Sequence, residues 1–148
     1  MGTHFKGSTK ELKTLNAFIK LVRSVESLNS AQSKSLAKEN LTISQFGALE
    51  ALLHLGPLNQ REIGKKLLKS GGNITLVIDN LEKRGLVKRK ADTKDRRAVI
   101  VSLTAKGRAF IEEYFPKHLA LLVDEFSVLT DEEKDTLASL CKKLGLKE

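Results

Sequence analysis

The chain has 148 residues, of which 41% are hydrophobic and 30% are charged, and its formal net charge is +8. This length and composition predict one compact unit, or a small domain with an extension. No stretch approaches the roughly 18 uncharged apolar residues of a membrane helix. The amino end lacks the apolar block of a signal peptide, so we expect a cytoplasmic protein with no membrane partner. The single cysteine, Cys141, excludes an internal disulfide and a cysteine-based structural zinc site.

The amino-terminal region is predicted to form one long amphipathic helix from about Ser8 to Ala37. Apolar residues recur there every three or four positions, and lysine and arginine occupy the opposite face. The polar segment SLNSAQSKS weakens the pattern, but it contains no proline or glycine that would force a break.

Two shorter helices follow, and each begins with a capping signal. Thr42 precedes Gln45 by three residues, and Asn59 precedes Glu62 by the same interval. At this spacing each side chain can hydrogen-bond the other residue's backbone amide. A glycine and a proline in succession end the first of these helices.

The next helix is predicted from about Ser70 to Arg84, and its first turn is small and polar. Its sequence, SGGNIT, places small hydrogen-bonding groups where the backbone amides and the positive end of the helix dipole project. Such an end can lie against phosphates or base edges. Because Gly-Gly also occurs in ordinary tight turns, the segment alone does not establish that contact. The core stripe of the helix is expected to consist of Ile74, Val77, Ile78 and Leu81.

Two strands and two further helices complete the predicted order. The segments LVKRK and AVIVSL are rich in β-branched residues, and the connector ADTKDRR is expected to project as a loop tipped with one lysine and two arginines. Thr104 is predicted to cap the following helix, in which Pro116 predicts a kink or a break. Thr130 begins the last helix with another capping signal.

Most of the excess positive charge lies in one module. Residues 59–108 contain 14 of the 26 Lys and Arg but only five of the 18 Asp and Glu, a net charge of +9, whereas the rest of the chain has a net charge of −1. A basic module on a nearly neutral body indicates that a polyanion binds there, and nucleic acid is the leading candidate. Charge runs are usually solvated surface, so any single lysine is more often a bystander than a contact.

The order helix, short helix, helix with a polar first turn, strand, charged loop, strand is that of a winged helix-turn-helix. The predicted fold class is therefore mainly α with a small β-hairpin wing, flanked by helices at both ends of the chain. An α-helix fits the major groove of duplex DNA, whereas an arginine on a slender loop suits the narrow minor groove.

Three segments, NQREIGKKL, GGNITLVIDNLEKRGLVKR and DTKDRRAVIVSLTAKG, resemble the MarR (multiple antibiotic resistance regulator) family of bacterial transcription factors. The most specific part is the D-x-x-D-R-R loop that leads into V-x-L-T-x-x-G. With long helices on both flanks, the resemblance covers essentially the whole chain.

The resemblance implies a single MarR-like unit over residues 1–148, with a DNA-binding winged helix-turn-helix at 42–104 between dimerisation helices at 8–40 and 105–146. It implies a homodimer that binds a pseudo-palindromic double-stranded DNA operator, usually as a repressor. It also implies that a small phenolic or other lipophilic effector releases the protein from DNA.

Carried onto this sequence, the resemblance places DNA contacts on the helix from Ser70 to Arg84 and on the wing. One wing arginine typically enters the minor groove, and Asp95 can hold the neighbouring guanidinium in place by a charge-assisted bond. We expect Arg97 in the groove and Arg96 on phosphate or in a supporting role, although little in the sequence separates the two. Lys65, Lys66, Lys69, Lys88, Arg89 and Lys90 would be backbone contacts or bystanders. The predicted DNA-binding residues are Ser70, Gly72, Asn73, Thr75, Lys69, Lys88, Arg89, Asp95, Arg96 and Arg97.

Other chemistry finds less support in the sequence. Cys141 lies on the apolar stripe of the last helix, so we expect it in the core or in a dimer interface. The three histidines lack metal-ligand spacing, so we expect no metal site and no cofactor. No nucleophilic side chain is grouped with a base, so we do not expect the protein to be an enzyme. The candidate residues for an effector pocket are Phe18, Phe46, His54, Tyr114 and His118. For most of them, packing in the protein core is the alternative role.

A function of another class stays open, because a winged helix can also serve as an RNA-binding or protein-interaction module. Such a module would show little sequence preference on duplex DNA.

Overall fold

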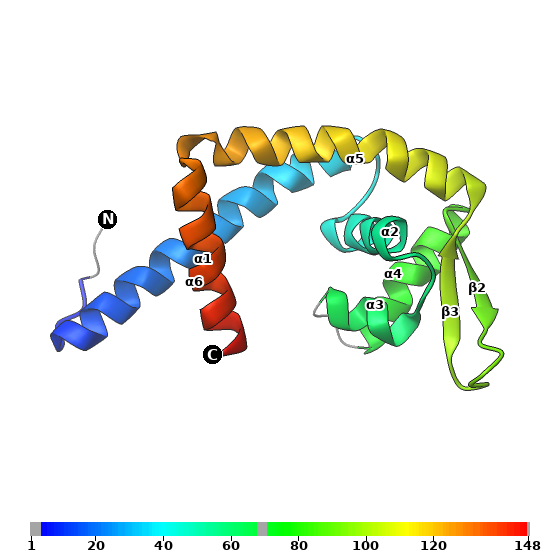
Figure 1. Ribbon diagram of the computed structural model, residues 1–148, viewed down its shortest axis with the longest axis horizontal. Helices are drawn as coiled ribbons and strands as arrows, with labels where there is room; N and C mark the ends of the chain where they lie inside the picture. Colours follow the sequence, from blue (N-terminus) through cyan, green and yellow to red (C-terminus); the bar gives the residue numbers. More distant parts are fainter. Residues whose placement is uncertain (1–3, 68–70, 148) are drawn as a thin grey trace. The chain divides into compact units, whose positions relative to one another are not determined.

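The computed structural model describes residues 4–67 and 71–147, with the backbone alone described at residues 71 and 72. The chain divides into two compact units, which meet in sequence between Ile111 and Glu112. Figure 1 shows the order of the helices and strands along the chain. Within the described residues, no helix is both long and apolar enough to cross a membrane.

The first unit begins with two helices, and each starts after a capping residue. Helix α1 (Thr9–Ala37) begins after Ser8, whose side chain forms a reciprocal cap with Glu11. Helix α2 (Ile43–Leu55) begins after Thr42, whose hydroxyl accepts from the Gln45 amide, and it ends at Gly56 with φ 77°. A glycine is needed there because this backbone region disfavours other residues.

Two further helices and a small sheet complete this unit around one core. Helix α3 (Gln60–Lys66) carries the predicted cap between Asn59 and Glu62, and helix α4 (Gly71–Lys83) follows it. Both helices contact each other and pack beside α2 and the sheet (Figure 1). The largest fully buried side chains are Phe46, Leu36, Leu49, Leu52, Ile63, Ile78, Leu81, Ile111, Val87 and Val101.

The sheet has three antiparallel strands, where the sequence predicts two. Strands β2 (Val87–Ala91) and β3 (Val99–Leu103) form the expected hairpin. Strand β1 (Leu58–Asn59) pairs with the other edge of β3, so the strand order is β1-β3-β2. The two-stranded expectation is therefore wrong, because a two-residue strand has no alternation to detect and its partner lies far away in sequence. The fold class of a mainly helical protein with a small wing is confirmed.

The start of helix α5 (Ala105–Glu125) is fastened to the turn before β2. Gly85 forms that turn with φ 71°, and the Thr104 hydroxyl donates to its carbonyl at 2.6 Å. The same hydroxyl accepts from the Gly107 amide at 3.0 Å, which confirms the predicted cap. A Cβ on Gly107 would lie 1.9 Å from the Leu86 carbonyl oxygen, so only glycine fits this approach.

The second unit contains the remainder of α5, a short 3-10 turn (Phe126–Val128) and helix α6 (Asp131–Leu146). Helix α5 continues through Pro116, so the break that was one expected outcome at this proline is wrong. The cap between Thr130 and Glu133 is formed as predicted. The Thr130 backbone amide donates to the Glu133 carboxylate at 2.9 Å, and the Thr130 hydroxyl accepts from the Glu133 amide at 3.1 Å. Hydrogen bonding of the carboxylate to the backbone and the side chain of Thr130 lowers the pKa of Glu133.

Candidate nucleic-acid interface

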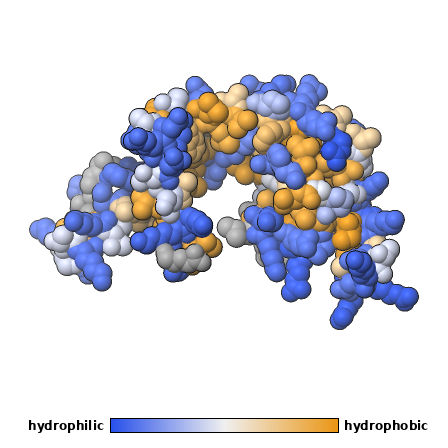
Figure 2. All heavy atoms as spheres, in the orientation of Figure 1, coloured by the Kyte–Doolittle hydropathy of each residue, from blue (hydrophilic) through white to orange (hydrophobic). Residues whose placement is uncertain are grey.

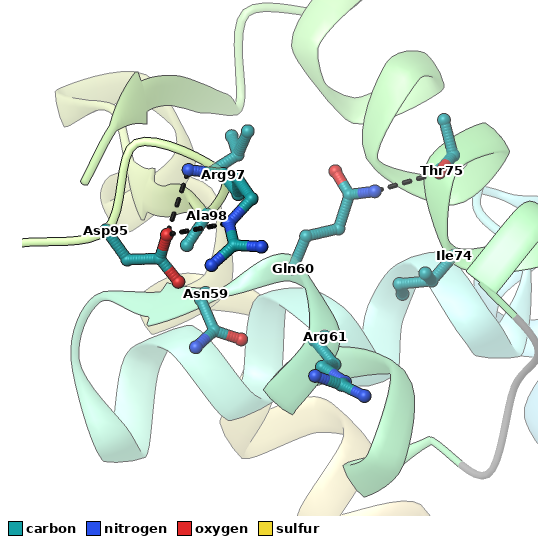
Figure 3. Close-up of a pocket in the computed structure, with 9 residues that line it drawn as sticks. Asn59, Gln60, Arg61, Ile74, Thr75, Asp95, Arg97 and Ala98 are labelled. Atoms are coloured by element: carbon teal, nitrogen blue, oxygen red, sulfur yellow. Dashed lines mark hydrogen bonds and ion pairs between the residues drawn. The ribbon is translucent and has the colours of Figure 1, made fainter.

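Helix α4 presents a polar face opposite its buried stripe. Ile74, Ile78 and Leu81 are at most 2% exposed, whereas Asn73 and Thr75 point away from the core and are exposed. The Thr75 hydroxyl accepts from the Gln60 side-chain amide at 2.8 Å, so the start of α3 is joined to α4 at this surface (Figure 3). The helix therefore offers the predicted polar residues to a ligand outside the protein.

The wing ends in a turn ordered by two aspartates. The Asp92 carboxylate accepts from the Lys94 amide at 2.9 Å, and the Asp95 carboxylate accepts from the Arg97 amide at 3.0 Å. The same Asp95 oxygen lies 3.8 Å from Nε of Arg97, whose side chain is 96% exposed. Asp95 thus fixes the backbone turn at Arg97 and leaves the guanidinium in solvent. Figure 2 shows hydrophilic side chains projecting from the end of this hairpin.

Helix α4, the start of α3 and the wing surround one open cleft. Its volume is about 700 Å³, and Figure 3 shows Arg97 and Asp95 on the wing side, Thr75 on α4, and Gln60 between them. The predicted residue Thr75 is thereby brought together with Asp95 and Arg97, although it lies far from both in sequence. The complete lining is Asn59, Gln60, Arg61, Ile74, Thr75, Asp95, Arg97, Ala98 and Val99.

Arg89 holds strand β2 to helices α3 and α4. Its guanidinium forms ion pairs with Asp79 at 2.7 Å and Glu82 at 3.1 Å, and it donates to the Gln60 side chain at 3.3 Å. It also donates to the Thr75 carbonyl at 3.3 Å, and its side chain is only 21% exposed. These contacts favour a structural role for Arg89, and its predicted contact with DNA stays a prediction. The guanidinium is committed to intramolecular partners, which the sequence could not reveal because they lie seven to 29 residues away.

The other predicted basic and polar residues have simpler surroundings. Lys88, beside Arg89 on β2, is exposed, as are Lys65, Lys66 and Lys90, and Arg96 is exposed at the wing tip. Gly72 belongs to the first turn of α4. Lys69 and Ser70 lie outside the described residues.

Gln60 and Arg61 are site residues that the sequence did not single out. Both line the cleft from the first turn of α3, and Arg61 is exposed. Arg61 belongs to the basic stretch, but nothing local distinguishes it from the other cations there. The capping signal at Asn59 was the available indication, since residues just after a cap lie at a helix end that favours anions.

The five candidate effector-pocket residues are in different environments. Phe46 is 2% exposed and belongs to the core of the first unit, whereas Phe18 is 60% exposed on α1. His54 is exposed and lines a shallow pocket of about 440 Å³ with Gly47, Glu50, Ala51, Leu55, Lys66 and Leu67. In the second unit, Tyr114 and His118 are 4% and 5% exposed. Phe46 therefore packs in the core of the first unit, and an effector contact by any of the five residues stays a prediction.

Cys141 is exposed on α6, which excludes the core alternative within the protomer, and the dimer-interface alternative stays a prediction. The stripe on which it lies is apolar, but the described part of the chain leaves the cysteine in solvent. Among residues 4–67 and 71–147, no group of three His, Cys, Asp or Glu side chains is placed to hold a metal ion.

The three-stranded sheet, the paired helices α3 and α4, and the arginine-tipped hairpin define a winged helix-turn-helix protein. A family model described as "MarR family" matches residues 41–99. The transcriptional regulator MhqR of Bacillus subtilis is 37% identical over 134 residues, which cover 90% of this chain and 92% of that protein. The chain belongs to the MarR family.

Solved structures agree with this assignment. Bordetella bronchiseptica BpsR, whose DNA binding is regulated by 6-hydroxynicotinic acid, is 27% identical with a TM-score of 0.79, and the match covers 87% of this chain and 98% of that one. A mutant of Escherichia coli MarR, complexed with operator DNA, is 26% identical with a TM-score of 0.78. That match covers 94% of this chain and 99% of the MarR chain.

Proposed function

We propose that this protein is a sequence-specific double-stranded DNA-binding transcriptional regulator that acts as a repressor. The main support for this proposal is the cleft that is lined both by the outward face of α4 and by the solvent-exposed Arg97. Helix α4 enters the major groove, and the wing lies over the adjacent minor groove. The net charge of +9 over residues 59–108 supplies the attraction to phosphates.

The regulator acts as a homodimer through the helices at 8–40 and 105–146. Large apolar side chains remain exposed on these helices, which is the expected state of an interface seen without its partner. Static light scattering at micromolar concentration is expected to give twice the mass of 16.4 kDa, and a monomer would refute this assembly. The exposed residues are Phe18, Val22 and Val25 on α1, Leu119 and Val123 on α5, and Leu137, Leu140, Leu144 and Leu146 on α6.

A small lipophilic or phenolic effector is proposed to release the operator. The regulation of BpsR by 6-hydroxynicotinic acid supports control by a small molecule. The effector would change the distance or angle between the two α4 helices of the dimer, so that they no longer fit successive major grooves. It must bind the released arrangement more tightly than the DNA-bound one, by about 3 kcal/mol for a change of roughly 150-fold in affinity.

Selection from a pool of random DNA duplexes tests the proposal. The protein is expected to enrich one motif whose two halves are related by two-fold symmetry. Affinity for the selected duplex should fall steeply with salt, because cations on the protein displace counterions from phosphates. An unenriched pool, or tighter binding to RNA of the same sequence, would instead support an RNA-binding or protein-interaction module.

A further inference from the structure

One large apolar side chain interrupts the polar outward face of α4. Leu76 is 61% exposed, whereas the buried stripe of the same helix is at most 2% exposed at Ile74, Ile78 and Leu81. Its neighbours on the outward surface, Asn73 and Thr75, are polar and exposed. Leu76 therefore lies in solvent on the surface of α4 that would face DNA in the proposed function.

The position of Leu76 follows from helix geometry. Each residue turns an α-helix by about 100°, so Leu76 lies almost diametrically opposite Ile74, Ile78 and Leu81. Asn73 and Asn80 flank it on one side, and Thr75 lies on the other. Leu76 and the two asparagines also line a shallow groove of about 270 Å³ beside the start of α2. The leucine thus occupies the middle of the surface that would face the floor of a groove.

The exposure of Leu76 is not unusual in itself, but its position within the basic stretch is. Single exposed apolar residues are common on protein surfaces. Among the described residues of the basic stretch 59–108, however, the exposed large apolar side chains are Leu76 and Val99, and Val99 belongs to the wing. Most of the others lie on α1, α5 and α6, where the proposed dimer would cover them. Leu76 lies outside those helices, so the dimer does not account for its exposure.

We infer that Leu76 packs against the 5-methyl group of a thymine in the major groove and so selects thymine at one position of each operator half-site. This inference rests on the proposed function. A leucine side chain makes no hydrogen bond to a base edge, and the thymine methyl is the apolar group that the major groove presents. The polar residues on either side hydrogen-bond neighbouring bases, so the methyl contact is enclosed and loses its water. Amides such as those of Asn73 and Asn80 suit adenine.

Replacement of thymine by deoxyuridine tests the contact, because uracil lacks the methyl but keeps the base pairing. In the duplex obtained by random-pool selection, each thymine of a half-site is replaced singly, and affinity is measured by fluorescence anisotropy. One position should weaken binding by roughly fourfold, as expected for one buried methyl group. The other positions should change affinity by less than about twofold.

The variant Leu76→Ala completes a double-mutant cycle with the uracil substitution. It should bind the thymine operator more weakly than the natural protein, and it should no longer distinguish thymine from uracil at the sensitive position. Leu55→Ala is the matched control, since Leu55 is 54% exposed at the end of α2. This control should retain the full difference. Thermal melting should show both variants folded, because both leucines are exposed.

Two results would overturn the inference while leaving the proposed function intact. The first is an operator whose affinity is insensitive to uracil at every position. The second is a thymine preference that persists unchanged in Leu76→Ala, because the methyl would then act through DNA shape or another residue. An unenriched pool would overturn the proposed function and this inference together.

Discussion

At the scale of single residues, the wing contains two adjacent arginines with different surroundings. Asp95 accepts from the Arg97 amide and lies 3.8 Å from its Nε atom, so the turn presents Arg97 with its side chain exposed. Arg97→Ala is therefore expected to weaken operator binding by roughly tenfold or more, as for other groove-inserted arginines. The melting temperature should stay unchanged because the side chain is 96% exposed. Binding titrations at fixed salt measure the effect.

Arg96→Ala is the control for this assignment. Arg96 is exposed, and we expect it to contact a DNA phosphate or to support Arg97. Its loss should therefore reduce DNA affinity less than the loss of Arg97. It should also lower the slope of affinity against salt by about one counterion. An equal or larger loss in Arg96→Ala would reverse the roles of the two arginines. The double variant should abolish tight binding.

Arg89 and Lys88 are neighbours on β2 with opposite expected roles. Arg89→Ala removes ion pairs to Asp79 and Glu82 and hydrogen bonds to α3 and α4. The carboxylates are 44% exposed and partly screened, so we expect a loss of about 1–2 kcal/mol in the free energy of unfolding. Urea denaturation measures this loss.

Lys88→Ala separates structure from DNA contact at the same strand. Lys88 is exposed, so this variant should leave the denaturation midpoint unchanged and lower the slope of affinity against salt by about one. A stable Arg89→Ala protein with a reduced salt slope would show that Arg89, and not Lys88, meets the DNA backbone.

At the scale of elements, Gly107 fixes where α5 begins. An added Cβ would lie 1.9 Å from the Leu86 carbonyl oxygen, which is backbone and cannot turn aside as a side chain would. Gly107→Ala should therefore destabilise the fold by about 2 kcal/mol or more and lower the melting temperature by roughly 5 °C. Differential scanning calorimetry provides the measurement.

Gly145→Ala is the matched substitution in another helix. Nothing lies within 4 Å of the added Cβ, and Gly145 lies in α6. Alanine stabilises a helix relative to glycine by about 0.5–1 kcal/mol, so the melting temperature should stay the same or rise. If both substitutions had the same effect, the contact with Leu86 would not explain the glycine at position 107.

The cap of α6 predicts a dependence on pH. Hydrogen bonds from the backbone and hydroxyl of Thr130 lower the pKa of Glu133 below its ordinary value of 4.5 in the folded state. The cap therefore stabilises the helix above pH 4.5, and this contribution is lost as pH falls through the lowered pKa. Glu133→Gln should show a smaller loss of stability across that acid range, as followed by circular dichroism. An identical pH profile in both proteins would contradict the assignment.

Elements were predictable from the sequence where their signals are local. The caps at Thr42, Asn59, Thr104 and Thr130 each depend on residues within three positions, and each is formed. Strand β1 was missed because its pairing with β3 is set by tertiary structure. The same reason explains Arg89, whose partners come from α3 and α4, and Cys141, whose periodic position indicated burial that the protomer does not provide. Periodicity identifies an apolar face but not what covers it.

At the scale of the whole molecule, specific binding requires two copies of the winged module on one duplex. A single α4 reads only a few base pairs, so operator specificity depends on a second α4 placed about one helical turn away by the dimer. Leu76 and Arg97 then act twice in each complex, once per half-site. Their substitutions should affect both halves of the operator equally.

Hydroxyl-radical footprinting of the selected operator tests this claim most directly. We predict protected segments arranged symmetrically about the operator centre, with half-sites about 10 base pairs apart. In the single variant Arg97→Ala, at a protein concentration raised to restore full occupancy, the minor-groove protection under the wings should disappear from both sides. A single asymmetric protected segment, or no protection at all, would contradict a dimer that reads both half-sites.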